Sequence, residues 1–554
     1  MKKRFLSSIL CMALVSSLLV GCGSNSATSN ETAQTEEATQ TDGQQTDASG
    51  ETDENAAADS EAVQDLGDPK YGGTLRLATH ISCATPGYTP EITNNAGLLY
   101  LTTAYESLIY YDEAGNIIPK LAEEWLPDAN EPSITWTLKE NVTFADGEPF
   151  NAEAVKRNIE EYQSCQRNEV ANIKSCEVID DTHIKMVLNS WSSSTLESVG
   201  FFVYYMSPKA LEDVDTLRNS SCGTGPFQVT KFEPNVKTEY TKNENYRQEG
   251  KPYLDGVVID VVAEPTTRSS AFAAGEYDIV HMNNLTVAND LINTGKYVVN
   301  KNTSGQGLIM TGLIPNSARE NTPFADEKVR QAMCYAIDTE TLCTALGYGL
   351  IETTDQWASR DAITYNKDLT SFGYDPEKAK ALLAEAGYPD GFDTILTTDA
   401  GSKDMFTAAA NMLSEVGIRC EINLVDESTG SSLYQTGAWE GIMGHFASIG
   451  PDLGLYMGRH LDVDGAFYAK GIQHPQEALD LLEAIRTAPS EEEKVKLEWD
   501  MQKLMYDGET GLALFGKPLF VQNEPNIKYD YVIDDATGVC NSNTWNIENC
   551  WLNK

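Results

Sequence analysis

The stretch ITWTLKENVTFADGEPFNAEAVKRN, Ile134–Asn158, decides the fold class. Apolar residues alternate in Ile134–Leu138, which predicts a half-buried strand, and Val142–Phe144 repeats the alternation as a second, paired strand. Asp146-Gly147 supplies a turn. Asn151 then precedes apolar residues at helical spacing, which predicts a capped helix. The stretch therefore combines strands and a helix in one unit.

Strands and helices continue through the rest of the chain. Asp375 before Pro376 predicts a helix that ends at Gly387, and Ser490 with Glu493 forms a capping box before another helix. With 554 residues, the chain exceeds the size at which a single core stops growing. We therefore predict a mixed α/β or α+β body of two or three lobes. Further strands are predicted at Gly72–Ala78, His183–Leu188, Phe227–Phe232 and Val257–Val262.

The N-terminus has the features of an exported lipoprotein. Basic residues at positions 2–4 precede an apolar run that ends in LVGC, which predicts a signal peptide over residues 1–21 and lipidation of Cys22. After Cys22, residues up to 69 contain twelve Asp or Glu, no Lys or Arg and almost no large apolar residue. Residues 22–69 are therefore predicted to be a lipidated cysteine and a disordered acidic tether. This places the protein at the cell membrane, on its extracytoplasmic face.

Charge and cysteine content restrict the partners. The formal net charge of −43 argues against nucleic acid binding. Of eleven cysteines, Cys11 leaves with the signal peptide and Cys22 takes the lipid, so an odd number remains and at least one stays unpaired in a monomer. No spacing of Cys and His indicates zinc, and we predict no cofactor and no metal. The neighbours in sequence that are candidates for disulfides are Cys165/Cys176 and Cys540/Cys550.

The sequence contains no convincing catalytic motif. Neither a GxSxG elbow nor an HExxH pair occurs, and GLALFGK at Gly511–Lys517 resembles a phosphate loop except that Pro518 replaces the Ser or Thr. Asp462-Val463-Asp464-Gly465 lacks the remaining acids of a calcium loop. A binding protein is therefore the main hypothesis, with a secreted hydrolase and an adhesive lipoprotein as alternatives of other classes.

Five separated blocks carry a family resemblance. They are Ile134–Asn158, CGTGPF at Cys222–Phe227, AGEYD at Ala274–Asp278, PFADEKVRQAMCYAID at Pro323–Asp338, and YDPEKAKALLAEAGYPDGF at Tyr374–Phe392. Together they resemble the peptide- and nickel-binding family of ABC transporter extracellular solute-binding proteins, solute-binding protein family 5. Most of these residues have structural roles. We expect Gly223 and Gly225 to allow a tight turn, and Arg330 to cap or join elements.

The resemblance implies a two-lobed periplasmic-binding-protein-like fold with an extra inserted subdomain. Lobe 1 would contain residues 70–113, 223–320 and 509–554, the inserted subdomain residues 114–222, and lobe 2 residues 321–508. It implies a monomeric substrate-binding component of an ABC importer, which captures peptides or peptide-like molecules by hinge closure and delivers them to a permease and ATPase complex.

The resemblance also locates a ligand-facing segment at Thr436–His460. Its W-x-x-D motif aligns with Phe446–Ile449, so Ile449 stands where oligopeptide binders carry the aspartate that holds the α-ammonium of the peptide. This argues against a free amine as the anchor at that point, unless Asp452 takes over the role. The predicted ligand-binding residues are His445, Phe446, Ser448, Ile449, Asp452, Tyr456 and Arg459.

Other ligands of the same family are alternatives. Nickel-chelate members use an arginine and a tryptophan after the early helix and a further arginine before a Ser-Pro pair. This chain has Arg167 but no tryptophan beside it, and Phe201–Pro208 contains no arginine. A nickel chelate, an opine or another small molecule remains the alternative to peptides.

Overall fold

The computed structural model describes residues 68–92, 97–111, 116–300, 308–399, 402–463, 465, 467–522, 525–533 and 545–554. They belong to one compact unit, Leu66–Lys554. The predictions for the signal peptide, for the lipidation of Cys22 and for most of the tether lie outside the described residues.

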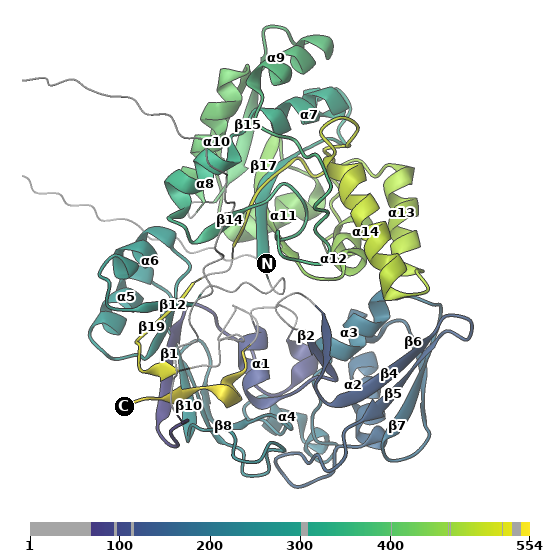
Figure 1. The fold of residues 1–554 in the computed structure, drawn as a ribbon, viewed down its shortest axis with the longest axis vertical. Coiled ribbons are helices and arrows are strands. Elements are labelled where there is room, and N and C mark those ends of the chain that lie inside the picture. Colours follow the sequence, from purple (N-terminus) through teal and green to yellow (C-terminus); the bar gives the residue numbers. More distant parts are fainter. Residues whose placement is uncertain are drawn as a thin grey trace, which may run out of the picture. The chain divides into compact units, whose positions relative to one another are not determined.

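The first sheet has seven strands in the order β12-β19-β11-β1-β10-β9-β8 (Figure 1). At its centre β1 pairs in parallel with β10 and β11, and its Leu75 and Leu77 are fully buried. Helices α5 (Pro265–Ala273) and α6 (Leu285–Ile292) pack on this sheet through Phe272 and Leu291. We call this sheet and its helices the first lobe. The strands are β1 (Thr74–Thr79), β8 (Phe227–Glu233), β9 (Lys237–Lys242), β10 (Gly256–Val261), β11 (Ile279–His281), β12 (Val298–Asn300) and β19 (Asn526–Lys528).

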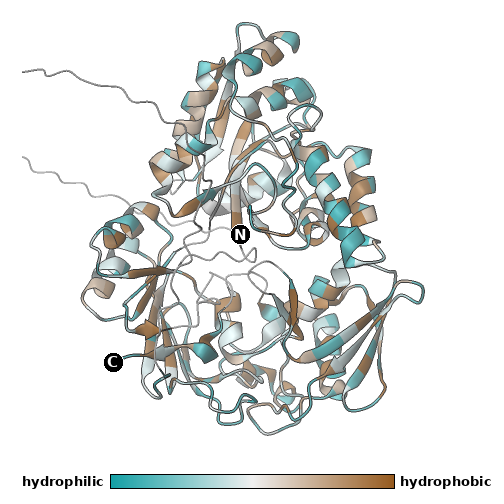
Figure 2. Ribbon diagram, viewed as in Figure 1, coloured by the Kyte–Doolittle hydropathy of each residue, from teal (hydrophilic) through white to brown (hydrophobic). Residues whose placement is uncertain are grey.

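The second sheet has six strands in the order β14-β18-β13-β17-β15-β16. Neighbouring residues such as Ile442 and Met443 join different hydrophobic clusters, because side chains alternate between the faces of a strand. One cluster joins the sheet to α7–α10 and the other joins it to α12–α14. In Figure 2, α13 and α14 show both hydrophilic (teal) and hydrophobic (brown) residues, as expected for helices with one buried face.

We call this sheet and its helices the second lobe. The strands are β13 (Leu308–Pro315), β14 (Ile351–Thr353), β15 (Phe392–Thr398), β16 (Ile418–Leu424), β17 (Ile442–Ile449) and β18 (Lys517–Gln522). The helices are α7 (Glu327–Tyr335), α8 (Thr339–Gly347), α9 (Pro376–Glu385), α10 (Lys403–Glu415), α11 (Glu427–Thr436), α12 (Leu453–Leu461), α13 (Gln476–Arg486) and α14 (Glu491–Tyr506).

The inserted subdomain contains a four-stranded sheet in the order β4-β5-β7-β6 with helices α2 and α3. As predicted, β5 is a strand and Asn151 caps α2, accepting a hydrogen bond of 3.0 Å from the backbone N–H of Ala154. Its elements are β4 (Ala122–Asp128), β5 (Ser133–Leu138), β6 (Ile173–Val178), β7 (His183–Leu188), α2 (Ala152–Ser164) and α3 (Ser194–Phe202). Other short elements of the chain are α1 (Leu98–Ala104), α4 (Val214–Leu217), β2 (Ile109–Tyr111), β3 (Ile117–Pro119), β20 (Val532–Ile533) and β21 (Trp551–Leu552).

The second strand of the deciding stretch was predicted wrongly. Val142–Phe144 forms only an isolated bridge between Thr143 and Pro149, and β5 pairs instead with β4 and β7. The preceding Asn141 has a φ of 59°, a left-handed conformation that turns the chain out of the sheet. The apolar residues of Val142–Phe144 do alternate, but the turn at Asn141 keeps this segment out of the hydrogen-bonded sheet.

Other local predictions are confirmed. Asp375 caps α9 through the N–H of Lys378 at 2.9 Å, and Ser490 caps α14 through the N–H of Glu493 at 3.3 Å. The Arg330 guanidinium is buried and donates to the carbonyls of Phe324, Ala325 and Leu512, so it joins elements as expected.

The reason for the two glycines of the CGTGPF block is different from the one predicted. Neither Gly223 nor Gly225 has a positive φ. A Cβ at Gly223 would lie 2.3 Å from the carbonyl oxygen of Ala104, and one at Gly225 would lie 2.5 Å from the carbonyl carbon of the same residue. Close backbone packing against the end of α1 therefore requires glycine at both positions.

The chain passes between the two lobes twice. It leaves the first sheet at Asn300 and enters the second at Leu308, then leaves the second at Gln522 and re-enters the first at Asn526. The predicted boundaries assigned residues up to 320 and from 509 onward to lobe 1, whereas β13 and β18 in those ranges pair within the second sheet. The C-terminus packs on the first lobe, where the Lys554 ammonium pairs at 2.7 Å with Asp278, the residue before β11.

Candidate functional site

A cavity of about 610 Å³ is lined by residues of both lobes. On the first lobe, His80 follows the end of β1 and Asn283 follows the end of β11. On the second lobe, Asp399 and Asp426 follow the parallel strands β15 and β16. The carboxyl ends of parallel strands are where open α/β sheets bind ligands. The geometry therefore makes this cavity the candidate binding site.

The first-lobe wall is held by buried polar contacts. The Thr79 hydroxyl lies 3.1 Å from Nδ1 of His281, and the rings of His281 and His80 lie 5.3 Å apart. The buried Arg268 donates to the carbonyl of His281 at 2.8 Å and to the side-chain oxygen of Asn283 at 2.6 Å. These bonds fix the loops that face the cavity.

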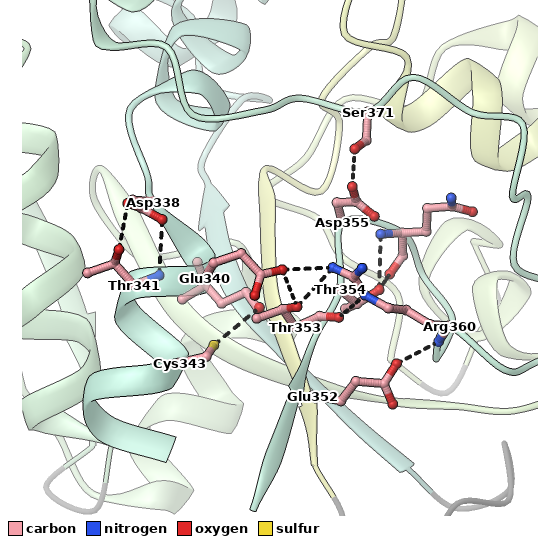
Figure 3. Close-up of polar contacts among 12 residues, drawn as sticks. Asp338, Glu340, Thr341, Cys343, Glu352, Thr353, Thr354, Asp355, Arg360 and Ser371 are labelled. Atoms are coloured by element: carbon pink, nitrogen blue, oxygen red, sulfur yellow. Dashed lines mark hydrogen bonds and ion pairs between the residues drawn. The ribbon is translucent and has the colours of Figure 1, made fainter. Parts of the chain in front are cut away.

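The rim between α8 and β14 presents Leu346 and Tyr348 to the cavity. Tyr348 ends α8 in a left-handed conformation, with a φ of 53°. Figure 3 shows the polar contacts that hold this connection. Arg360 donates to Glu340 at 3.0 Å and to the Thr353 hydroxyl at 2.9 Å, and that hydroxyl donates to Glu340 at 2.8 Å. The rim is therefore tied to the strand beside it.

Strand β17 contributes Met443, Gly444 and His445 to the cavity. The His445 ring stacks on Tyr434 with centroids 4.0 Å apart. Burial lowers the pKa of His445 to about 4, so the imidazole is neutral at pH 7. His445 therefore offers a neutral polar and aromatic surface.

Replacing Gly444 by alanine should reduce the free energy of unfolding by about 1–3 kcal/mol. A Cβ at Gly444 would lie 2.6 Å from the Phe406 ring, which is buried in the second-lobe core. Urea unfolding measures the change. Gly373→Ala is the matched control, because its Cβ would meet no atom within 4 Å. Equal effects of the two substitutions would contradict the prediction.

Neither Ser448 nor Ile449, two other predicted site residues on β17, lines the cavity, although the strand that pairs with β17 contributes Ile309 and Thr311 to it. Ser448 pairs in register with Ile309, and Ile449 is only 1% exposed within the second-lobe core. The backbone of Phe446 pairs with Thr311, but its side chain lies outside the described part of the structure. Of the predicted residues on β17 whose side chains the structure describes, His445 is the one at the cavity.

Asp452 lies in a buried charged cluster that joins α3 of the inserted subdomain to the second lobe. It caps α12 through the N–H of Leu455 at 2.7 Å, accepts from the Ser194 hydroxyl at 3.0 Å and pairs with Lys494 at 3.3 Å. Nearby, Glu498 accepts from the N–H of Leu453 at 2.8 Å. The Asp452 carboxylate is therefore already bound by groups of the protein itself.

The remaining predicted residues are on α12. Tyr456 is buried, and its ring covers Gly450, where a Cβ would lie 2.3 Å from a ring carbon. The Arg459 guanidinium lies 4.8 Å from the centroid of the Phe467 ring, a cation–π contact. Tyr456 and Arg459 are therefore near His445 in the sequence but do not line the cavity.

Two further expectations concern metals and thiols. Cys165 and Cys176, neighbours in sequence, both carry free thiols, and Cys165 lies 3.2 Å from the Tyr88 hydroxyl. Cys540 lies outside the described residues. Within the described ranges, no three His, Cys, Asp or Glu side chains form a group that could hold a metal ion. The helices of the same ranges include none that is long and apolar enough to span a membrane.

Residues 116–466 match the family model described as Bacterial extracellular solute-binding proteins, family 5 Middle. The chain belongs to this family. Its curated relatives include the nickel-binding periplasmic protein of Escherichia coli, 28% identical over 355 residues, which cover 60% of this chain and 67% of that protein. They also include the glutathione-binding protein GsiB of Salmonella typhi, 26% identical over 458 residues, which cover 78% of this chain and 87% of the relative.

Solved structures share the fold. The periplasmic binding protein DppA of Helicobacter pylori in complex with the peptide STSA has a TM-score of 0.68 at 22% identity, covering 88% of this chain and 99% of DppA. NikA of Brucella suis in complex with Fe(III)-EDTA has a TM-score of 0.74 at 21% identity, covering 87% of this chain and 100% of NikA. The fold of this chain is therefore the two-lobed fold of periplasmic binding proteins. The family and these neighbours are binding proteins.

Sequence reasoning missed most of the residues that line the cavity. His80, Asn283, Asp399 and Asp426 come from four separate segments. Each stands directly after a strand or within two residues of its end. Polar residues at strand ends were the available signal, but β11, β15 and β16 were not among the predicted strands.

Proposed function

We propose that this chain is the substrate-binding lipoprotein of an ABC importer and captures peptides or peptide-like molecules between its lobes. The observation that carries the proposal is the cavity at the carboxyl ends of strands from both lobes. A ligand that contacts both walls favours the closed arrangement by its differential affinity for it. The bound protein would then be recognised by a permease and ATPase complex. Peptides and nickel complexes, bound by relatives, are the two ligand classes to compare first.

We propose that the ligand is not anchored through a free α-ammonium at the end of β17. Ile449 supplies no carboxylate there. Asp452 already accepts a hydrogen bond from Ser194, pairs with Lys494 and caps the N-terminus of α12. A buried ammonium without a carboxylate partner is strongly unfavourable. Acetylated or reversed peptides and peptide-like amides fit this arrangement. His445 would contact them from the wall of the cavity.

Calorimetry and small-angle scattering test the proposal. An acetylated peptide should bind at least as tightly as its free-amine counterpart, and saturation should reduce the radius of gyration. Preference for the free amine, abolished by Asp452→Asn, would contradict the absence of an ammonium anchor. Binding without compaction would contradict closure.

We propose that Cys22 carries the lipid and that Cys22→Ala moves the protein from the membrane fraction to the soluble fraction. The thiol of this cysteine is the acylation site that the LVGC sequence predicts. Cys11→Ala is the matched control and should remain with the membranes. Membrane association of Cys22→Ala after washing at high salt would contradict the prediction.

A further inference from the structure

The inserted subdomain and the first lobe share one hydrophobic core. The cluster that contains Leu75 of β1 also contains Trp136 of β5 and Val199 of α3. The buried apolar residues of the second lobe form separate clusters. The inserted subdomain therefore belongs to the body of the first lobe, and its contact with the second lobe must open when the lobes separate.

Polar groups hold this contact, which joins α3 to helices α12–α14. The backbone N–H of Ser193 donates to the carbonyl of Arg486 at 2.6 Å, and the Ser194 hydroxyl donates to Asp452 at 3.0 Å. Because these bonds cross between two separately packed bodies, they can break without the unfolding of either core.

Three carboxylates are buried at the contact. Glu197 of α3 is 2% exposed, Asp452 of α12 is 1% exposed and Glu498 of α14 is fully buried. The cation that faces Glu197 is Lys494, which already pairs with Asp452 at 3.3 Å. One ammonium does not neutralise three carboxylates, and a buried carboxylate without a cation is strongly unfavourable. The closed contact therefore favours a proton on Glu197.

The surroundings of Glu197 act in the same direction. Asp452, Lys494 and Glu498 face it from the second lobe, and Tyr111 faces it from β2. Burial, and next Asp452, raise the pKa of Glu197 well above its ordinary value, although Lys494 opposes this rise. The proton on Glu197 thus depends on the second lobe lying against α3.

Other titratable groups of the packed elements do not supply a second cation to Glu197. Burial raises the pKa of the Tyr111 and Tyr456 phenols, so both are neutral at pH 7. Further charged side chains of these elements have other partners: Glu491 pairs with Lys494, Arg486 with Asp462 and Arg167 with Glu169, and Arg459 lies over the Phe467 ring.

We propose that the contact between α3 and the second lobe is a pH-sensitive latch, which closes with a proton on Glu197 and opens as the pH rises. When the lobes separate, Glu197 moves into water with α3, whereas Asp452, Lys494 and Glu498 stay together on the second lobe. An exposed glutamate is ionised at pH 7, so opening releases the proton. Each unit of pH above the ordinary pKa of glutamate should therefore weaken closure by about tenfold, until the raised pKa of the closed form is reached.

The latch has a consequence for the ligand, which rests on the hinge closure of the proposed function. A ligand held between the lobes binds the closed form, so its affinity should fall as the pH rises. The protein would then hold its ligand more tightly in a mildly acidic medium.

Hydrogen exchange of the ligand-free, full-length protein tests the latch. The amide of Ser193 donates across the contact, so its protection factor reports the ratio of closed to open contact. This factor, taken relative to the unprotected rate at each pH, should fall by about tenfold per unit between about pH 5.5 and pH 7.5. Amides of β13, inside the second sheet, should be protected far more strongly, because they exchange only when the lobe unfolds.

Replacing Glu197 by glutamine separates its charge from its shape. Glutamine resembles the protonated acid, so the contact should form in the variant and the protection of Ser193 should no longer vary with pH. Glu160→Gln, on the exposed face of α2, is the matched control and should keep the pH dependence of the natural protein.

Three results would overturn the latch. The first is a protection factor of Ser193 that stays constant with pH in the natural protein, or that still varies with pH in Glu197→Gln. The second is equal protection of Ser193 and β13, because the contact would then open only on unfolding. The third is an unprotected Ser193 at every pH, which would show that the contact does not form. These measurements need no ligand, so the latch and the proposed function can fail separately.

Discussion

Replacing Lys494 by methionine should lower the free energy of unfolding by about 3–5 kcal/mol. The ammonium is buried, at 4% exposure, and pairs with Asp452 at 3.3 Å and Glu491 at 2.7 Å. Although burial opposes its charge, Asp452 and Glu498 raise the pKa of Lys494. The substitution would leave the buried Asp452 carboxylate without its cation, which costs more than the pair itself contributes. Urea unfolding measures the loss.

Lys496→Met is the control for this substitution. Lys496 lies two residues further along α14 and pairs with Glu492 at 2.6 Å, but both side chains are exposed. Exposed pairs at this helical spacing contribute about 0.5 kcal/mol or less. A loss for Lys494→Met as small as that for Lys496→Met would show that the buried cluster is solvated.

Glu498→Gln should make the protein more stable at alkaline pH while leaving its stability near pH 5 unchanged. Burial raises the pKa of Glu498 from 4.5 to about 8. Between these values the native state holds a proton that the unfolded state releases, so the stability of the natural protein falls as the pH rises. Glutamine resembles the protonated acid and removes this slope. The gain near pH 9 should be about 4 kcal/mol.

Unfolding in urea at a series of pH values tests this expectation. Burial, and next Asp452, also raise the pKa of Glu197, which faces the same cluster from α3. Its contribution is common to both proteins and cancels in their difference. Glu493→Gln, on the exposed side of α14, is the control substitution. A difference in stability between Glu498→Gln and the natural protein that stays constant with pH would contradict the assigned proton.

The elements that the sequence predicted correctly depend on local signals. Strand β5 and helix α9 follow from alternation, capping residues and a terminal glycine within one short window. The strand at Val142–Phe144 failed because the left-handed conformation of Asn141 is not visible in the apolar pattern. Local sequence signals determine which helices and strands form, whereas the positions where these elements end depend on the backbone angles of single residues.

The site was less predictable because it depends on long-range pairing. Asp399 and Asp426 approach His80 only after two sheets have formed and the chain has crossed between them twice. Conversely, Asp452 and Tyr456 are near His445 in sequence, but the turn after β17 takes them into a buried layer. Which residues face a cavity between lobes is a property of the assembled sheets.

The contact between the inserted subdomain and the second lobe contains its own spectroscopic probe. The Trp191 indole donates to the carbonyl of Ala488 at 3.0 Å, and the neighbouring Ser193 donates to the carbonyl of Ile485 at 3.0 Å. Separation of these segments would break the indole bond and expose the ring to water, which shifts tryptophan emission to longer wavelength. The intrinsic fluorescence that Trp191→Phe removes would therefore report the opening and closing of this contact in real time, without an added label.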